Sequence, residues 1–129
     1  MAERVLLDAS ALLAYLHREP GFEAVRAALR EGAVIGAVNL AEALGKVREK
    51  GRDAAKIHAA LRALGLQVLP FEEADAALAG ELGPLARKHG LALGDRAALA
   101  QAMRRGMPVL TADRVWAELD LQAEVRVIR

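Results

Sequence analysis

The sequence predicts a three-layer α/β/α domain built on a mainly parallel sheet of roughly five strands. Short apolar runs alternate along the chain with segments of helical periodicity, the pattern of α/β proteins. The runs contain few polar residues, as expected for strands covered by helices on both faces. A chain of 129 residues with 54% hydrophobic content can form one buried core. We therefore expect residues 1–129 to form a single domain.

The expected strands are five short apolar runs, each ended by a turn or a polar residue. They cover residues 5–7, 33–38, 66–69, 109–110 and 125–128.

The expected helices lie between these runs and show apolar residues at helical spacing. They cover residues 11–16, 22–30, 40–50, 53–64, 72–82 and 95–105, followed by a last helix that carries Trp116 and Leu119. Gly83 and Pro84 should kink or split the helical segment that precedes Gly90. Gly106 and Pro108 should end the helix 95–105.

Composition excludes several classes of site. The chain has no cysteine, so it cannot form a disulfide or a thiolate zinc site. Its three histidines do not have the HxxxH spacing of a zinc hydrolase. No apolar run resembles a signal peptide or is long enough to span a bilayer, so we expect a cytoplasmic protein without membrane contact.

Four acidic residues occupy special positions in this pattern. Asp8 and Asp113 each follow an apolar run, Glu42 comes soon after another, and Asp95 begins a helix. In a parallel sheet the carboxyl ends of the strands share one edge, which is where ligands bind in open α/β sheets. The four acids are therefore expected to line one cleft.

Helix capping is an alternative explanation of the same residues. Aspartate is a preferred N-cap residue and contributes about 1 kcal/mol there. Glu42 lies three residues after Asn39, the spacing of a capping box, and Ser10 is a further candidate cap. The sequence leaves capping and ligand binding open for each position.

Four acids in one cleft would require compensation. Two unit charges about 4 Å apart repel by roughly 4 kcal/mol at an effective dielectric constant near 20. Either some carboxyl groups take up protons or a cation binds. Because the ligands would be oxygen atoms only, the expected ion is Mg²⁺ or Mn²⁺, and such a site suits hydrolysis of a phosphodiester.

Four segments in this order resemble the signature segments of PIN-domain ribonucleases, most closely the VapC-type toxins of toxin–antitoxin pairs. They are VLLDASALLAYL, NLAEAL, LALGDRAALAQA and VLTADRVW. The resemblance covers nearly the whole chain and implies a PIN fold, a magnesium- or manganese-dependent endoribonuclease acting on RNA, a homodimer, and inhibition by a cognate antitoxin protein. By position it implies metal-binding and catalytic roles for Asp8, Glu42, Asp95 and Asp113, with supporting hydroxyl groups from Ser10 and Thr111.

Basic residues near the acids are candidates for substrate binding. Arg96 and Arg114 directly follow two of the acids and could bind phosphates through two hydrogen bonds. Lys46 is the first residue of a basic cluster that could attract RNA. The cluster comprises Lys46, Arg48, Lys50, Arg52 and Lys56. A solvated helix surface is the alternative explanation for these residues.

Two other classes of protein fit parts of the pattern. A phosphoacceptor receiver domain has a similar length, a doubly wound sheet and an aspartate after its first strand. A catalytically silent α/β domain that only binds a partner would use all four acids as caps. Glycine-rich phosphate-binding motifs do not occur in the chain.

Overall fold

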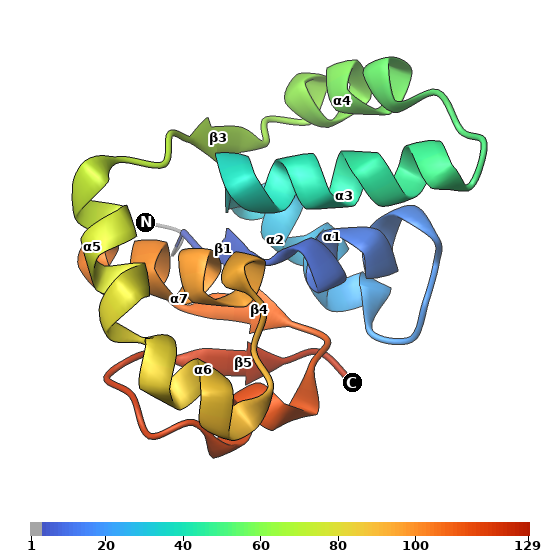
Figure 1. Ribbon diagram of the computed structural model, residues 1–129. Coiled ribbons are helices and arrows are strands. Elements are labelled where there is room, and N and C mark those ends of the chain that lie inside the picture. The colour runs from blue at the N-terminus through green and yellow to red at the C-terminus, as the bar shows by residue number, and fades with distance from the viewer. Residues whose placement is uncertain (1–3) are drawn as a thin grey trace.

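The computed structural model describes residues 4–129 and confirms the predicted fold class. A parallel sheet lies between two layers of helices (Figure 1). Its strands are β1 (Leu6–Leu7), β2 (Val34–Gly36), β3 (Gln67–Leu69), β4 (Val109–Thr111) and β5 (Val125–Val127). The five strands are ordered β3-β2-β1-β4-β5, and every neighbouring pair is parallel.

The helices follow the predicted segments closely. They are α1 (Ala9–Leu16), α2 (Phe22–Glu31), α3 (Ala37–Glu49), α4 (Ala54–Ala63), α5 (Glu73–Glu81), α6 (Gly83–His89) and α7 (Leu93–Arg105), with a 3₁₀ helix η1 (Arg114–Glu118). The predicted break at Gly83 and Pro84 is confirmed, since α6 begins there with the proline in its first turn. No helix within residues 4–129 has the length and apolar character needed to cross a membrane.

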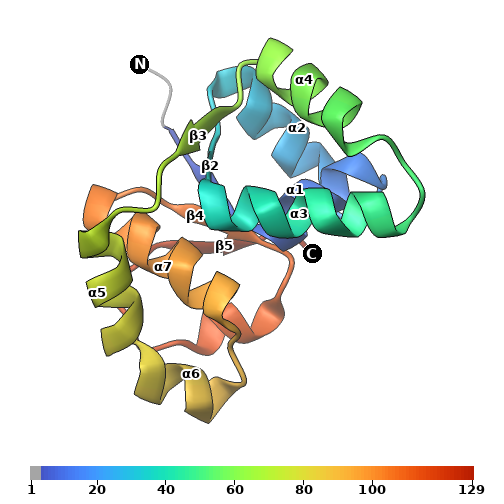
Figure 2. The same ribbon diagram turned by 45° about the horizontal axis from the view of Figure 1, so that its top comes forward.

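Each face of the sheet has its own hydrophobic core. Leu7 and Ile35 pack with apolar residues of α1 to α4, whereas Leu6 and Val34 pack with residues of α5 to α7. Adjacent strand residues point to opposite faces, so each two-residue step serves both cores. Figure 2 shows α1 to α4 on one side of the strands and α5 to α7 on the other. This arrangement explains why the strands are almost wholly apolar.

The position of β1 in the sheet fixes where a ligand can bind. β1 lies between β2 and β4, so the chain moves in opposite directions across the sheet from this central strand. The crevice beyond the carboxyl ends of strands at such a switch point is the usual ligand site of open α/β sheets. The order also excludes the receiver-like alternative, because receiver domains have the strand order 2-1-3-4-5.

A buried ion-pair cluster joins α5 to α7. Asp75 is fully buried and accepts hydrogen bonds from Arg104 Nη1 at 2.6 Å and from Arg105 Nη1 at 3.1 Å. The backbone N–H of Glu72 donates to its other carboxylate oxygen at 2.8 Å. We call Asp75, Arg104 and Arg105 the arginine clamp. It fixes the carboxyl end of α7 against α5.

Three helix starts differ from the predictions. β2 ends at Gly36 and α3 begins at Ala37, so the expected helix start at residue 40 is wrong. Asn39 lies inside the helix and does not form the capping box with Glu42 that the sequence left open. The apolar sequence continues through Val38 without a polar cap, which conceals this boundary. α7 begins at Leu93, two residues before Asp95. The cap of α1 is Asp8 and not Ser10.

Candidate active site

All four predicted acids line one small pocket at the carboxyl ends of the central strands. The pocket has a volume of about 130 Å³. Its walls come from the start of α1, from α3, from the first turn of α7 and from the N-cap residue of η1. The lining residues are Asp8, Ala9, Ser10, Leu13, Asn39, Glu42, Lys46, Asp95 and Asp113. The predicted convergence of acids from four distant segments is therefore observed.

Asp8 is held rigidly by hydrogen bonds. It follows β1 directly, is only 3% exposed, and caps α1 by accepting the Ala11 N–H at 2.8 Å. The Ser10 hydroxyl lies 2.7 Å from Asp8 Oδ1 and the Thr111 hydroxyl donates to Oδ2 at 2.6 Å. A carboxylate oriented by three donors is both a cap and a fixed ligand group, so capping does not compete with a binding role here.

The same hydroxyl groups connect β1 to β4. The Ser10 hydroxyl accepts the Ala112 N–H at 2.9 Å, and the Thr111 hydroxyl accepts the Asp113 N–H at 3.1 Å. Asp113 in turn caps η1, accepting the Val115 N–H at 3.0 Å. These bonds set the position of the backbone that carries Asp113. Ser10 and Thr111 are therefore placed where the sequence predicted supporting hydroxyl groups.

Glu42 is positioned by Asn39, which the sequence offered only as a helix cap, and by Gly94, which the sequence did not single out. The buried Asn39 amide donates to Glu42 Oε1 at 3.4 Å and to the Gly94 carbonyl oxygen at 3.1 Å. A side chain on Gly94 would overlap the Glu42 carboxylate, so this glycine leaves the space that Glu42 occupies. An asparagine one helical turn before an acid was the available sequence signal for the first contact. The contact of Gly94 with Glu42 could be found only from the packing of α7 against α3.

Asp95 is electrostatically at the centre of the pocket. It lies in the first turn of α7, where its carboxylate accepts the Ala92 N–H at 2.8 Å. Its negative charge acts on both Asp8 and Glu42, and the charge of Asp113 acts on Asp95. Every acid of the pocket is thus coupled to this one residue.

The pocket disfavours its own negative charges. Burial raises the pKa of Asp8 to about 6, despite its hydrogen bonds, and the charge of Asp95 adds to this effect. Burial also raises the pKa of Glu42, as does Asp95, while Lys46 partly offsets the increase. The pKa of Asp95 is raised by burial and by Asp113, against the hydrogen bond from Ala92. A bound cation would relieve these costs.

The donor chemistry of the pocket fits a hard divalent cation. It offers carboxylate and hydroxyl oxygens, which are the ligands that Mg²⁺ and Mn²⁺ take in proteins. Within residues 4–129 no three or more acidic, histidine or cysteine side chains lie close enough together to hold a metal ion as a group. Mg²⁺ commonly keeps several waters and uses only one or two carboxylates, so a partial set of protein ligands suits it.

The predicted substrate-binding residues are not equally close to the acids. Lys46 lines the pocket. Arg96 is directed toward α5 and α6, where its Nη1 donates to the Ala79 carbonyl at 3.4 Å. Arg114 donates through Nε to the backbone carbonyl of Arg129 at 3.1 Å. The structure therefore brings Lys46 to the acids and places neither arginine on the wall of their pocket.

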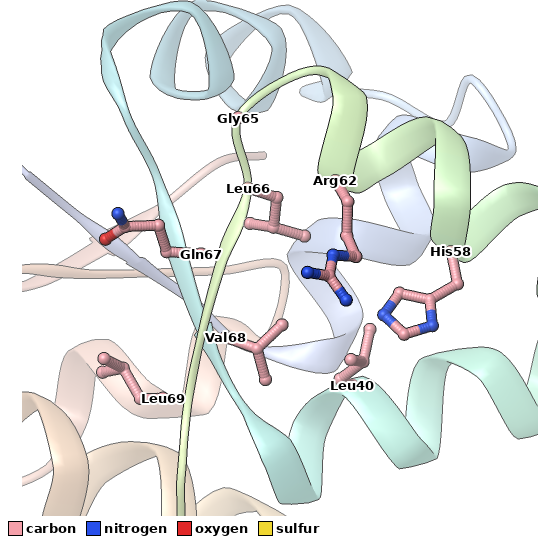
Figure 3. Close-up of a pocket in the computed structure, with 8 residues that line it drawn as sticks. All are labelled: Leu40, His58, Arg62, Gly65, Leu66, Gln67, Val68 and Leu69. Atoms are coloured by element: carbon pink, nitrogen blue, oxygen red, sulfur yellow. The ribbon is translucent and has the colours of Figure 1, made fainter.

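The largest cavity lies elsewhere. It measures about 760 Å³ and is formed by α3, α4 and the edge strand β3 (Figure 3). His58 and Arg62 point into it from α4, and Val68 and Leu66 face them from the β3 segment. None of the four acids lines it. The small acidic pocket is the better candidate active site, because reactivity depends on its charged groups and not on volume.

Several solved structures share the fold. A toxin–antitoxin complex from Klebsiella pneumoniae has a chain that matches with a TM-score of 0.75 and 15% identity, over 97% of this chain and 98% of that chain. VapC20 from Mycobacterium tuberculosis, described as a toxin that cleaves the sarcin–ricin loop, matches with a TM-score of 0.72 and 16% identity over 93% and 98%. FitAcB from Neisseria gonorrhoeae matches with a TM-score of 0.66 and 24% identity over 94% and 95%.

None of the curated proteins matches the sequence. The sequence does match one family model. The model of the PIN domain matches residues 5–121, a span that includes all four acids of the pocket. The resemblance found in the four sequence segments is thereby confirmed, and the chain belongs to the PIN-domain family.

Proposed function

We propose that this protein is a metal-dependent endoribonuclease and the toxin of a toxin–antitoxin pair. The observation that carries the proposal is the pocket of four converging acids, in which burial raises the pKa of Asp8 to about 6. Membership of the PIN-domain family supports the nuclease activity. The proposed RNA substrate is supported by the fold shared with VapC20, a toxin that cleaves the sarcin–ricin loop.

Mg²⁺ or Mn²⁺ is the proposed cofactor. The pocket acids Asp8, Glu42, Asp95 and Asp113 would hold it, one or two of them directly and the others through water molecules. When bound, such an ion activates a water for attack on a phosphodiester and neutralises charge on the leaving oxygen. A purely capping role for the acids does not explain why Asp95 is surrounded by three other carboxylates.

The protein's own residues orient this chemistry. Ser10 and Thr111 fix the Asp8 carboxylate, so the Asp8 side chain does not have to be ordered when a metal ion binds. The Ala92 N–H holds Asp95, and Asn39 holds Glu42. Lys46 is the cation on the pocket wall and would attract a phosphate of the substrate. Hydrolysis then needs only small movements of groups that are already in place.

An antitoxin protein and a second copy of the chain are the proposed partners. The Klebsiella structure is a toxin–antitoxin complex, and FitAcB shares the same fold. An inhibitor of this pocket would have to supply positive charge, because the acids repel an anionic one. Gel filtration of the protein alone would test the homodimer.

The decisive experiment compares two aspartate-to-asparagine variants. Purified wild-type protein, Asp95→Asn and Asp53→Asn are incubated with defined RNAs that contain single-stranded loops, in chelator or with millimolar Mg²⁺ or Mn²⁺. Asp53 is the matched control, because it caps α4 by accepting the Lys56 N–H and does not line the acidic pocket.

We expect metal-dependent cleavage by wild type and Asp53→Asn. Asp95→Asn should lose about 100-fold or more of the rate, because the metal contributes several kcal/mol to stabilising the transition state. Cleavage that persists in chelator, or equal activity of Asp95→Asn and wild type, would contradict the proposal.

A further inference from the structure

A second pocket beside the acids is lined by two arginines. It lies between α6 and the start of α7 and has a volume of about 450 Å³. Its lining includes Arg87 from α6 and Arg96 from α7, together with Gly83, Gly90 and Ala92. The loop that forms part of this wall leads from α6 up to the first turn of α7, which carries Asp95 (Figure 1).

The two guanidinium groups face the same small space. A methyl group placed on Gly83 would lie 3.8 Å from Arg96 Nη1 and 4.0 Å from Arg87 Nη1. Within residues 4–129, neither arginine forms an ion pair with a carboxylate. Arg96 Nε is buried and has no hydrogen-bond partner there. Two like charges that share a pocket without an acid are suited to an anion.

The packing of the helices explains only part of this arrangement. A basic residue in the last turn of α6 interacts favourably with the helix dipole, which accounts for the presence of Arg87. The dipole does not account for the buried, unpartnered nitrogen of Arg96 on the neighbouring helix. The arginine clamp shows the contrast, because there two arginines meet a buried aspartate.

We propose that Arg87 and Arg96 bind a backbone phosphate of the RNA strand, next to the phosphate that is cleaved. The proposal rests on the proposed nuclease function. Ala92 lines this pocket and its backbone N–H donates to the Asp95 carboxylate at 2.8 Å, so a strand held at the acids passes close to this pocket. Lys46 lies on the α3 wall of the acidic pocket, whereas the arginines lie on the α6 side.

A phosphate is favoured over a protein carboxylate by this location. The acidic pocket repels the phosphates of its own substrate, so the affinity for RNA has to come from cations on either side of it. Arginine binds phosphate through two parallel hydrogen bonds, and two arginines can hold one group from both sides. The pair would therefore anchor the strand without contacting the scissile bond.

The test measures RNA binding in chelator, so that the metal does not contribute. Fluorescence anisotropy with a short labelled single-stranded RNA is recorded over a range of salt concentrations for wild type, Arg87→Gln, Arg96→Gln and Arg96→Lys. Arg62→Gln is the matched control, since Arg62 is an exposed arginine in the distant β3-edge cavity (Figure 3). It removes the same charge.

We expect Arg87→Gln and Arg96→Gln each to weaken RNA binding about tenfold, with Arg96→Lys intermediate. The slope of log K against log salt should fall by about 0.7 for the one lost phosphate contact. In cleavage assays with metal, KM should rise while kcat stays unchanged, since the scissile bond is not touched. Arg62→Gln should behave as wild type. Arg87→Gln is the deciding variant, because within residues 4–129 its side chain makes no hydrogen bond or ion pair that folding depends on.

Three outcomes would overturn the inference. Arg87→Gln and Arg96→Gln that bind RNA like Arg62→Gln, while wild type still cleaves it, would exclude the anion site and leave the nuclease function standing. A glutamate-rich peptide whose binding is lost in these variants, with RNA binding unchanged, would assign the pocket to a protein carboxylate. A wild-type protein that neither binds nor cleaves RNA would overturn both the proposed function and this site.

Discussion

Asp75 and Asp8 are both buried aspartates, yet their surroundings treat the negative charge in opposite ways. Burial alone would raise the pKa of Asp75. The Glu72 N–H and the guanidinium groups of Arg104 and Arg105 outweigh this effect and lower the pKa to about 2. Burial raises the pKa of Asp8 to about 6, because its hydrogen bonds come from neutral groups and its charged neighbour is Asp95. The charges of the arginine clamp are paired, whereas the four acids that line the acidic pocket share it with one basic residue, Lys46.

The comparison distinguishes a structural acid from a binding one. A buried charge that is fully paired is costly to disturb and has no need of a ligand. A buried charge without a countercharge destabilises the empty fold and gains when a cation binds. Removing the carboxylate should therefore have opposite effects on stability in the two regions.

The largest effect is expected from breaking the clamp. Asp75→Asn leaves Arg104 and Arg105 without their buried countercharge, so we expect a loss of about 3 to 4 kcal/mol in the free energy of unfolding. Urea denaturation at pH 7.5 in chelator measures it. Asp53→Asn, which retains an exposed cap, is the control and should stay within about 0.5 kcal/mol of wild type. An Asp75→Asn protein as stable as the control would remove the basis of the comparison.

The pH dependence of stability should show the opposite behaviour of Asp8. Its pKa of about 6 in the folded protein lies above the usual value of 3.8. Its contribution to stability is therefore fully present below pH 3.8 and is lost as the pH rises through 6. The shift corresponds to about 3 kcal/mol. The pKa of Asp75 is lowered from 3.8 to about 2. Its contribution to stability is therefore present above pH 3.8 and is lost as the pH falls through 2.

Unfolding free energies in chelator at pH 4, 5, 6 and 7.5 test this expectation. The difference between Asp8→Asn and wild type should move in favour of the variant as the pH rises, by up to about 3 kcal/mol. Titration of the other acids is common to both proteins and largely cancels. A difference that stays constant across this range would show that ionisation of Asp8 does not destabilise the folded protein.

A slightly smaller effect is expected from metal binding. At a concentration 100 times the dissociation constant, Mg²⁺ or Mn²⁺ should stabilise wild type by about 2.7 kcal/mol, seen as a rise in melting temperature. Asp8→Asn and Asp113→Ala should reduce this rise, whereas Asp53→Asn, whose carboxylate lies outside the acidic pocket, should retain it. Equal responses of all variants would point to a site away from the acidic pocket.

The smallest effect on stability is expected at Gly94. In Gly94→Ala the new methyl group displaces the Glu42 carboxylate, a flexible side-chain end, so unfolding should change by less than about 1 kcal/mol. RNA cleavage should nevertheless fall to the level of Glu42→Gln. Gly45→Ala in α3, whose methyl group meets no neighbouring atom within 4 Å, is the control. Full activity of Gly94→Ala would show that the position of Glu42 does not matter.

The sequence predicted the parts of this molecule that depend on local pattern. Asp8 and Asp113 were placed correctly because each follows a continuous apolar strand, and parallel strands bring such positions to one edge. The start of α3 was predicted wrongly because its N-cap residue, Gly36, has no side chain that could cap the helix. With that boundary misplaced, Asn39 was read as a cap and its link to Gly94 was missed.

Side-chain direction could not be predicted from neighbouring positions in the chain. Arg96 follows Asp95, which suggested that both act at one place. Successive residues on a helix point in directions about 100° apart, and α6 occupies the side that Arg96 faces. Arg87 was not singled out at all, because only the packing of α6 on α7 brings the two arginines together.

Helix α7 belongs to both regions that are compared above. Its first turn carries Asp95 and its last turn carries Arg104 and Arg105, about 15 Å away at 1.5 Å per residue. The anchorage at one end thus sets the register of a reactive group at the other. Damage far from the chemistry can then appear as weakened metal affinity in a protein that still folds, so a partly inactivated variant need not carry its lesion anywhere near the acids.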